Sequence, residues 1–239
     1  MRAIIALTSF LMLSCSIAQH ARAELSLADR ATLNKVVEEF IRNNPNVVRE
    51  SLLSLAAREE TERKQIGLAR IRDDSGDPIM GNPNGTITLY EFSDYNCGYC
   101  KRVFEPLQQM LRANPDVKLV IKEFPILSQS SWFAAKAAIA AEMQGKFSDY
   151  HIGMMSYRGQ ITQDVVMQVA NDAGLDDTQL QKDMKSSKTA AIIQRTREAA
   201  KALEINGTPG LVIGDTIVPG AIGLDELLEL IAAERAKKG

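Results

Sequence analysis

The fold is decided by residues 86–102, which read TITLYEFSDYNCGYCKR. The alternation of β-branched and aromatic residues over 87–92 predicts a buried strand, and the apolar residues that recur at helical spacing after Cys100 predict a helix. Cys97 and Cys100 thus stand three residues apart where a strand passes into a helix, the arrangement of a dithiol redox site. The helix N-terminus would favour the Cys97 anion, and Cys100, one turn along, could close a disulfide ring with it.

The start of the chain has the pattern of a secretory signal peptide. Met1 and Arg2 give a positive start, an apolar run of about a dozen residues follows, and Ala21-Arg22-Ala23 offers small residues at the two positions that a signal peptidase reads. We therefore expect residues 1–23 to be a signal peptide that is cleaved after Ala23. Lipid attachment at Cys15 is the alternative, but the alanine site is the better formed of the two.

Composition excludes several classes of function. The net charge of the 239-residue chain is −2, so there is no basic surplus for nucleic acid or for an anionic membrane. Once the signal peptide is removed, Cys97 and Cys100 are the cysteines that remain, and a single close pair is not a disulfide scaffold. A structural zinc site would need four ligands, and only His151 could help. No phosphate loop, serine-nucleophile motif or dinucleotide fingerprint occurs, so we expect no cofactor and a pair that is kept for its reactivity.

Two long helices are predicted ahead of the cysteine motif, over 26–43 and 45–71, with apolar residues on one face of the first. They place an N-terminal α-helical segment at 24–75. Two isolated helices bury too little apolar surface to be stable alone, which favours an oligomerisation segment; a hairpin packed on the following domain is the alternative. Residues 73–85, rich in Asp, Ser, Gly, Pro and Asn, predict a linker.

Residues 76–239 predict an α/β domain with an interrupted sheet. A second strand over 117–124 is followed by some seventy residues with no strand signal, and then by a hairpin turning at Gly214-Asp215 and a last helix. The order is strand, helix, strand, helical block, hairpin and helix. It is the order of a small mixed sheet with an inserted all-helical subdomain, which we place at about 128–203.

With Gly207-Thr208-Pro209 before the hairpin, this arrangement resembles the thioredoxin fold of the bacterial periplasmic DsbA class, over about residues 82–237. The two leading helices resemble the N-terminal segment of the ScsC branch, which is associated with suppression of copper sensitivity and in which such helices assemble the molecule into an oligomer. The resemblance implies a periplasmic location for the chain and a thioredoxin domain over 76–239.

The resemblance also implies roles for four residues. Cys97 would be the attacking thiolate and Cys100 the resolving thiol, and the two would form the redox-active disulfide Cys97–Cys100. Pro209 would follow a cis peptide bond and face Cys97, where the backbone of Thr208 can pair with a bound peptide as a strand does. An ordinary turn before a strand is the alternative for this proline.

Further residues would tune the cysteine pair. Gly98 and Tyr99 lack the positive charge of the histidine found in the strong oxidase of this class, and a Gly-Tyr pair resembles the periplasmic disulfide isomerases, as does a threonine before the proline. Glu91 lies where the family has a buried acid that could take a proton from Cys100, and Lys122 on the neighbouring strand could hold the charge of that acid. A Glu91 that points outward from an edge strand is the alternative.

These observations predict a periplasmic thiol–disulfide oxidoreductase. The leading interpretation is a homo-oligomeric isomerase or reductase, dimer or trimer, which acts on misfolded or mis-oxidised periplasmic proteins and is kept reduced by a membrane-bound thiol reductant. A monomeric DsbA-like oxidase is the close alternative. A protein of copper tolerance that binds Cu(I) at Cys97 and Cys100 is an alternative of another class, since thiolates suit this soft ion, but the peptide-binding loop at Pro209 favours the enzyme.

Overall fold

The structure, a computed structural model, describes residues 26–238 and divides into two compact units, Met1–Leu55 and Ala56–Gly239. The expected signal peptide and its cleavage site lie outside the described residues. Within 26–238, no helix combines the length and the apolar character needed to cross a membrane.

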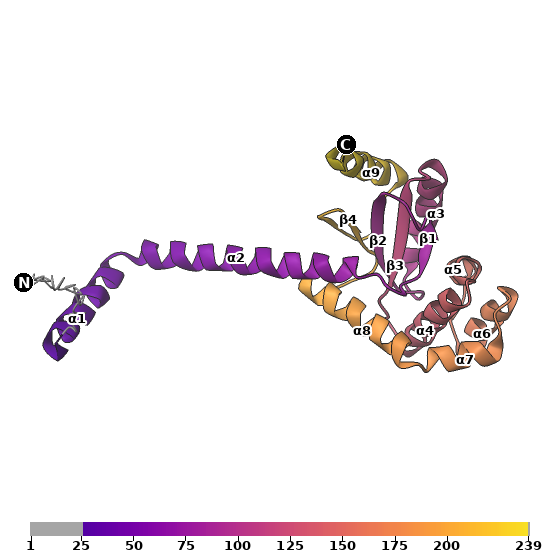
Figure 1. Cartoon of the computed structure of the whole chain (residues 1–239), viewed down its shortest axis with the longest axis horizontal. Helices are drawn as coiled ribbons and strands as arrows, with labels where there is room; N and C mark the ends of the chain where they lie inside the picture. The colour runs from indigo at the N-terminus through magenta and orange to yellow at the C-terminus, as the bar shows by residue number, and fades with distance from the viewer. Residues whose placement is uncertain (1–25, 239) are drawn as a thin grey trace, which may run out of the picture. The chain divides into compact units, whose positions relative to one another are not determined.

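The first unit holds α1 (Leu27–Asn43) and the beginning of α2 (Pro45–Arg72) (Figure 1). The Ser26 hydroxyl caps α1 by accepting a hydrogen bond from the backbone N–H of Asp29 at 3.2 Å. No residue of α1 is buried in the single chain. The exposed large apolar side chains of this unit are Leu27, Leu33, Val36, Val37, Phe40, Ile41, Val47, Val48, Leu52, Leu53 and Leu55.

The second unit is built on a five-stranded sheet with the strand order β1-β3-β2-β4-β5. β2 and β3 are parallel, and the other pairs are antiparallel. The strands are β1 (Ile79–Gly81), β2 (Ile87–Ser93), β3 (Val117–Glu123), β4 (Gly210–Ile213) and β5 (Thr216–Pro219). The expectation of a linker over 73–85 missed β1, because a strand of three residues is too short to show an alternating pattern.

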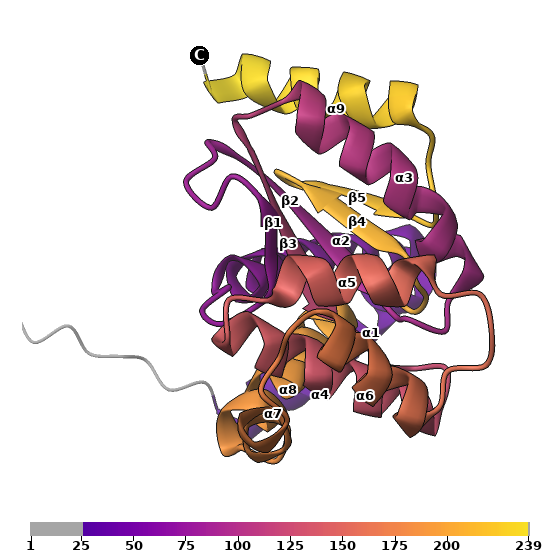
Figure 2. The ribbon, with the colours of Figure 1, turned by 90° about the vertical axis from the view of Figure 1, so that its right-hand side faces the viewer.

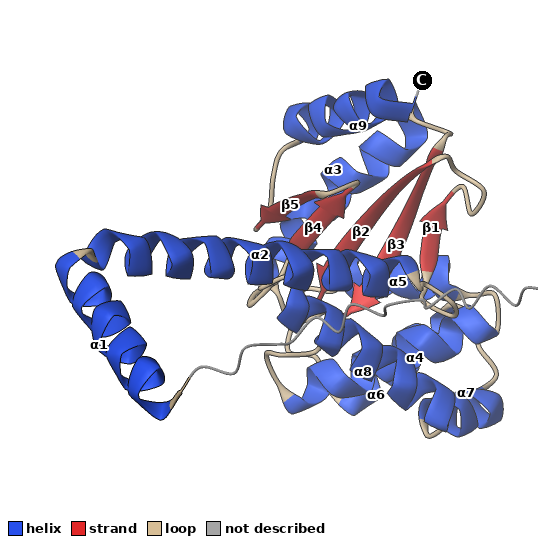
Figure 3. Cartoon of the chain, turned by 60° about the vertical axis from the view of Figure 1, so that its left-hand side comes forward, coloured by secondary structure: helices blue, strands red, loops and turns tan. Residues whose placement is uncertain are grey.

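The helices of this unit form two groups (Figures 2 and 3). α3 (Gly98–Ala113) and α9 (Leu224–Lys238) lie side by side over one face of the sheet. Between β3 and β4 the chain forms α4 (Gln129–Met143), α5 (Phe147–Ser156), α6 (Gln163–Asp172), α7 (Asp177–Met184) and α8 (Ser187–Ala202). This is a thioredoxin-like α/β fold with a helical insertion, so the fold class predicted from the sequence is confirmed.

The two faces of the sheet carry separate cores. Ile87 and Leu89 belong to the core that also holds both cysteines and the apolar side of α3. Phe92, on the opposite face, belongs to a second core with residues of α8 and with Leu68 and Ile71 from the last turns of α2. Those turns are part of this core, and the two compact units divide between residues 55 and 56, whereas the sequence predicts a domain boundary between 75 and 76.

A buried ion cluster lies on the second face. The Asp77 carboxylate pairs with the Lys122 ammonium at 2.6 Å and with the Arg195 guanidinium at 2.8 Å. Asp77 precedes β1, Lys122 belongs to β3 and Arg195 to α8, so one buried carboxylate joins three segments of the unit. Buried charges persist only when they are paired, and loss of one partner leaves the other without compensation.

We therefore expect Asp77→Ala to lower the free energy of unfolding by about 3–5 kcal/mol, because Lys122 would be left charged and buried without its carboxylate. Urea unfolding at neutral pH measures the effect. Asp215→Ala, which breaks the exposed pair with Arg72, is the matched control and should cost no more than about 1 kcal/mol. Equal losses in the two variants would contradict a structural role for the buried cluster.

Candidate active site

The cysteine motif lies at the start of α3, as expected. Cys97 is the N-cap of this helix, and its sulfur accepts a hydrogen bond from the backbone N–H of Cys100 at 3.5 Å. Both cysteines are free and buried. Cys97 can therefore act as a nucleophile whose charge is stabilised by the first turn of a helix.

The loop before β4 closes the site from the other side. The Thr208–Pro209 peptide bond is cis, and the Cys97 thiol donates a hydrogen bond to the Thr208 carbonyl oxygen at 3.1 Å. Strand pairing explains this proximity, because β4 lies antiparallel to β2 with Gly210 opposite Phe92. Pro209 thus has the peptide geometry and the place that the resemblance implied.

Several hydrogen bonds favour the Cys97 anion. The side chain of Cys100 makes the largest contribution, and the backbone amides of Cys100 and Tyr99 add to it. Burial acts in the opposite direction, and the net result lowers the pKa of Cys97 to about 5. Cys97 is then a thiolate at neutral pH, the form that attacks a disulfide.

The second cysteine has the opposite character. Burial is the main cause that raises the pKa of Cys100, and the hydrogen bond to Cys97 and the charge of Glu91 add to the rise. Cys100 therefore keeps its proton while Cys97 is ionised. This asymmetry separates an attacking sulfur from a sulfur that reacts only after its proton has been removed.

Glu91 lies beneath the motif with 1% of its surface exposed, so it does not point outward from an edge. Its carboxylate accepts a hydrogen bond from the Ser93 hydroxyl at 3.0 Å. Burial raises the pKa of Glu91 to about 7; Ser93 opposes this shift, and the charge of Cys97 adds to it. A group that titrates near neutrality can give and take protons at the working pH of the cell.

The structure places Lys122 away from this acid. In the parallel register, Ile121 is the partner of Glu91 and Lys122 is the partner of Phe92. Because successive side chains of a strand point to opposite faces, Lys122 lies on the other side of the sheet, where it pairs with Asp77. The expectation that Lys122 holds the charge of Glu91, and so tunes the redox pair, is therefore corrected.

The two residues between the cysteines are open to solvent. Tyr99 is 59% exposed, and the guanidinium carbon of Arg102 lies 3.9 Å from the centre of its ring. Gly98 is exposed, with no atom close to where a side chain would begin. Both residues could therefore contact a bound protein directly.

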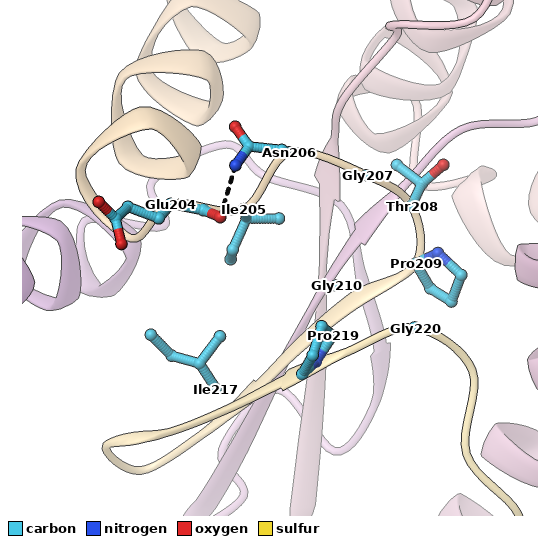
Figure 4. Close-up of a pocket in the computed structure, with 10 residues that line it drawn as sticks. All are labelled: Glu204, Ile205, Asn206, Gly207, Thr208, Pro209, Gly210, Ile217, Pro219 and Gly220. Carbon is cyan, nitrogen blue, oxygen red and sulfur yellow. Dashed lines mark hydrogen bonds between the residues drawn. The ribbon is translucent and has the colours of Figure 1, made fainter.

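A small cavity of about 300 Å³ adjoins the loop of the cis proline (Figure 4). Its walls are mostly backbone and apolar side chains, among them Ile205, Ile217 and Pro219. Next to a loop whose backbone can pair with a peptide, such a cavity has the size and polarity to hold one apolar side chain. Residues 26–238 contain no group of three or more His, Cys, Asp or Glu side chains that could hold a metal ion.

Sequence reasoning missed a buried polar cluster behind the motif. The Tyr95 hydroxyl donates to the Glu123 carboxylate at 3.1 Å and lies 2.9 Å from Nδ1 of His151. Asp94, in the same loop, accepts hydrogen bonds from the backbone N–H groups of Ile126 and of the residue after it. The cluster joins residues 56 positions apart through side chains, and no local pattern could have indicated it.

A dithiol at a helix N-terminus, opposite a cis proline on a thioredoxin-like sheet, defines the class of thiol–disulfide exchange proteins. The DSBA-like thioredoxin domain matches residues 88–232, more than half of the chain. The chain therefore belongs to the DsbA-like thioredoxin-domain family, which confirms the resemblance.

Solved structures agree with this assignment. A thioredoxin-like oxidoreductase of Silicibacter pomeroyi is 40% identical and covers 69% of this chain and 94% of its own, with a TM-score of 0.65. A linker-deletion mutant of Proteus mirabilis ScsC is 26% identical and covers 91% of this chain and 100% of its own, with a TM-score of 0.68. A periplasmic thioredoxin-like protein of Salmonella enterica is 30% identical and covers 72% of this chain and 97% of its own, with a TM-score of 0.66.

The curated relatives that rank first are larger proteins. The Na⁺/H⁺ antiporter NhaA 1 of Mycolicibacterium gilvum is 28% identical over 178 residues, which is 71% of this chain. The chain spans only 29% of the length of that relative. The similarity concerns a part of the antiporter chain and carries no statement about ion transport.

The pKa of Glu91 predicts a pH-dependent effect of Glu91→Gln on stability. In the folded state the pKa is raised from 4.5 to about 7, so the stability due to the neutral acid is complete below pH 4.5 and is lost as the pH rises through 7. Glutamine stays neutral, so the variant should gain up to about 3 kcal/mol over the wild type above pH 7 and nothing near pH 4.5. Urea unfolding of both proteins near pH 4.5 and above pH 7 measures this difference. An equal difference in the free energy of unfolding at the two pH values would show that the pKa of Glu91 is not raised.

Proposed function

We propose that this chain is a periplasmic protein thiol–disulfide oxidoreductase that works as an oligomeric isomerase or reductase. The observation that carries the proposal is the asymmetry of the pair, with a Cys97 thiolate stabilised at the N-cap of α3 and a protonated, buried Cys100 behind it. Two thiols with a purely structural role would not need pKa values that are shifted in opposite directions.

The exchange follows from that asymmetry. The Cys97 thiolate attacks one sulfur of a substrate disulfide, a mixed disulfide forms, and the other substrate sulfur leaves as a thiolate. In reduction, Cys100 then attacks the Cys97 sulfur and gives its proton to Glu91, the Cys97–Cys100 disulfide forms, and the second substrate sulfur leaves as a thiolate; both substrate thiolates take protons from water. In isomerisation, a second thiol of the substrate attacks the mixed disulfide instead, and Cys97 leaves as a thiolate with no net change in oxidation state.

The loop of the cis proline supports a polypeptide substrate. The Thr208 carbonyl lies 3.1 Å from the reactive sulfur, so a peptide that pairs with this backbone would bring its own cysteine to Cys97. The adjoining cavity suits an apolar neighbour of that cysteine. Misfolded or mis-oxidised proteins, which expose apolar side chains beside wrongly paired cysteines, fit both features.

The apolar face of the first unit supports an oligomer. No residue of α1 is buried in the single chain. Its exposed large apolar residues include Phe40 and Ile41. A helix of this composition gains its stability from a partner, and a second and third copy of the same helix provide one. Several active sites in one assembly would hold a substrate through repeated exchanges.

A periplasmic location and an external reductant complete the proposal. The signal-peptide pattern of the sequence and the periplasmic Salmonella relative support export. Reductase cycles oxidise the cysteine pair, and the periplasm is kept oxidising, so each cycle needs electrons from a membrane-bound thiol reductant.

The activity is tested with the full mature chain in two assays, reactivation of scrambled ribonuclease and reduction of insulin. We expect the wild type to support both, Cys97→Ser to abolish both, and Cys100→Ser to accumulate a mixed disulfide at Cys97 because the resolving thiol is absent. If the wild type fails in both assays but binds Cu(I) through Cys97, the enzyme hypothesis is wrong and the chain is a copper-binding protein. Oxidation of reduced ribonuclease alone would favour the oxidase alternative.

The oligomer is tested by charging the apolar face of α1. Phe40→Glu should convert the assembly to monomers, because a buried unpaired carboxylate is costly at an interface. Light scattering gives the mass, and the reduction of insulin should persist while the reactivation of scrambled ribonuclease falls. Lys35→Glu, on the same helix, is the control that should leave the mass unchanged. A wild type that is already monomeric would contradict the oligomer.

A further inference from the structure

A buried polar cluster of Tyr95, Glu123 and His151, here called the Tyr95 cluster, lies directly behind the cysteine motif. Each of the three side chains is 1% exposed. The Tyr95 hydroxyl has one proton, which it donates to Glu123 at 3.1 Å. The Nδ1 atom of His151 lies 2.9 Å from the same oxygen, and the tautomer that carries its proton on Nδ1 donates it to Tyr95.

The three residues come from separate parts of the fold. Tyr95 lies in the loop between β2 and α3, two residues before Cys97, while Glu123 is the last residue of β3 and His151 lies in α5 of the helical insertion. The cluster thus ties the loop that carries the reactive cysteine to the sheet and to the insertion at one oxygen atom.

His151 also contacts the far side of the motif. Its ring lies 5.3 Å from the ring of Phe104, centre to centre, in an edge-on arrangement, and 5.5 Å from the ring of Tyr95. Phe104 follows Cys100 by one turn of α3. The imidazole therefore contacts Tyr95, two residues before Cys97, and Phe104, four residues after Cys100.

Stability alone does not account for these polar groups. Among the described residues, Oε2 of Glu123 and Nε2 of His151 have no hydrogen-bond partner. Burial raises the pKa of Glu123 and lowers the pKa of His151 to about 3, so the imidazole stays neutral at the pH of the periplasm and does not switch with pH. Apolar residues of similar shape would avoid this loss of solvation, so a cluster that keeps two atoms unpaired calls for a role in the site.

We propose that the Tyr95 cluster is a positioning device for the redox pair: through Tyr95, the neutral imidazole of His151 and the Glu123 carboxyl fix the loop that carries Cys97. None of the three touches the reacting sulfur. Fixing the loop keeps the Cys97 sulfur against the N–H of Cys100, the contact that favours its anion. The inference rests on the proposed thiol exchange at Cys97.

Two pairs of full-length variants test the cluster. Tyr95→Phe keeps the ring but removes the oxygen on which both hydrogen bonds meet. We expect the pKa of Cys97, read from the thiolate absorbance, to rise by about 0.5 to 1 unit, and alkylation near pH 4.5 to slow by about two- to eightfold. Tyr90→Phe, at a buried tyrosine on the opposite face of the sheet, should change neither quantity.

Substitutions of His151 provide the second pair. His151→Asn places an amide where Nδ1 lies, so it can still donate to Tyr95 and should keep the pKa of Cys97 near that of the wild type. His151→Leu removes the donor and should raise the pKa as Tyr95→Phe does. A difference between asparagine and leucine is a signature of the hydrogen bond that packing alone would not give, and it decides the matter even if Tyr95→Phe fails to fold.

The outcomes separate the two proposals. If Tyr95→Phe and His151→Leu lose stability but keep the pKa and the alkylation rate of the wild type, the cluster only holds the fold together and the positioning role is overturned. If Cys97 of the wild type itself titrates as an ordinary thiol, near pH 8.5 or above, the proposed function fails before any variant is compared.

Discussion

The sulfur of Cys97 accepts a hydrogen bond from the backbone N–H of Cys100 and so serves as the side-chain cap of α3. A helix end must satisfy its first N–H groups, and here the group that does so is also the reactive atom. The contact is possible only where β2 passes into α3, and the Thr208 carbonyl reaches the same sulfur only because β4 lies next to β2. The five helices between β3 and β4 do not disturb this arrangement, since the insertion leaves the sheet and returns to it without separating the paired strands.

The two faces of the sheet handle buried charge differently. On the face of the second core, the Asp77 carboxylate is compensated by two cations, which makes it a structural group. On the face of the cysteines, no residue of the described range 26–238 gives Glu91 or Glu123 a cationic partner, and burial raises the pKa of both acids. A buried carboxylic acid without a cationic partner tends to keep its proton, because burial makes the ionised form costly. Glu91 therefore remains able to change its protonation state near pH 7.

The sequence was sufficient where the signal is local, and it failed where the contact is distant. The spacing of Cys97 and Cys100, the strand before them and the hairpin after Pro209 each lie within a few residues, so the fold class and the redox pair could be predicted. The partner of Lys122 could not be predicted in this way. The choice between Glu91 and Asp77 depends on which face of β3 the lysine occupies, and a one-residue change of register reverses that face. The cluster of Tyr95 and His151 is distant in the same sense, because only the packing of α5 brings the two together.

The burial of Cys100 bears on what the mixed disulfide does next. A cysteine with a low pKa is a good leaving group, so a mixed disulfide at Cys97 breaks readily when a second substrate thiolate attacks the substrate's sulfur and Cys97 leaves. The competing step is attack of Cys100 on the Cys97 sulfur, in which the substrate thiolate leaves and Cys97 becomes bonded to Cys100. Cys100 is fully buried and its pKa is raised, so under the proposed function its attack needs a base, and Glu91 is the candidate for that base. With Glu91 protonated, the proposed escape through Cys100 would be slow, and the substrate would have time to rearrange its own disulfides. Under the proposed function, the protonation of this one buried acid would therefore shift the balance between reduction and isomerisation.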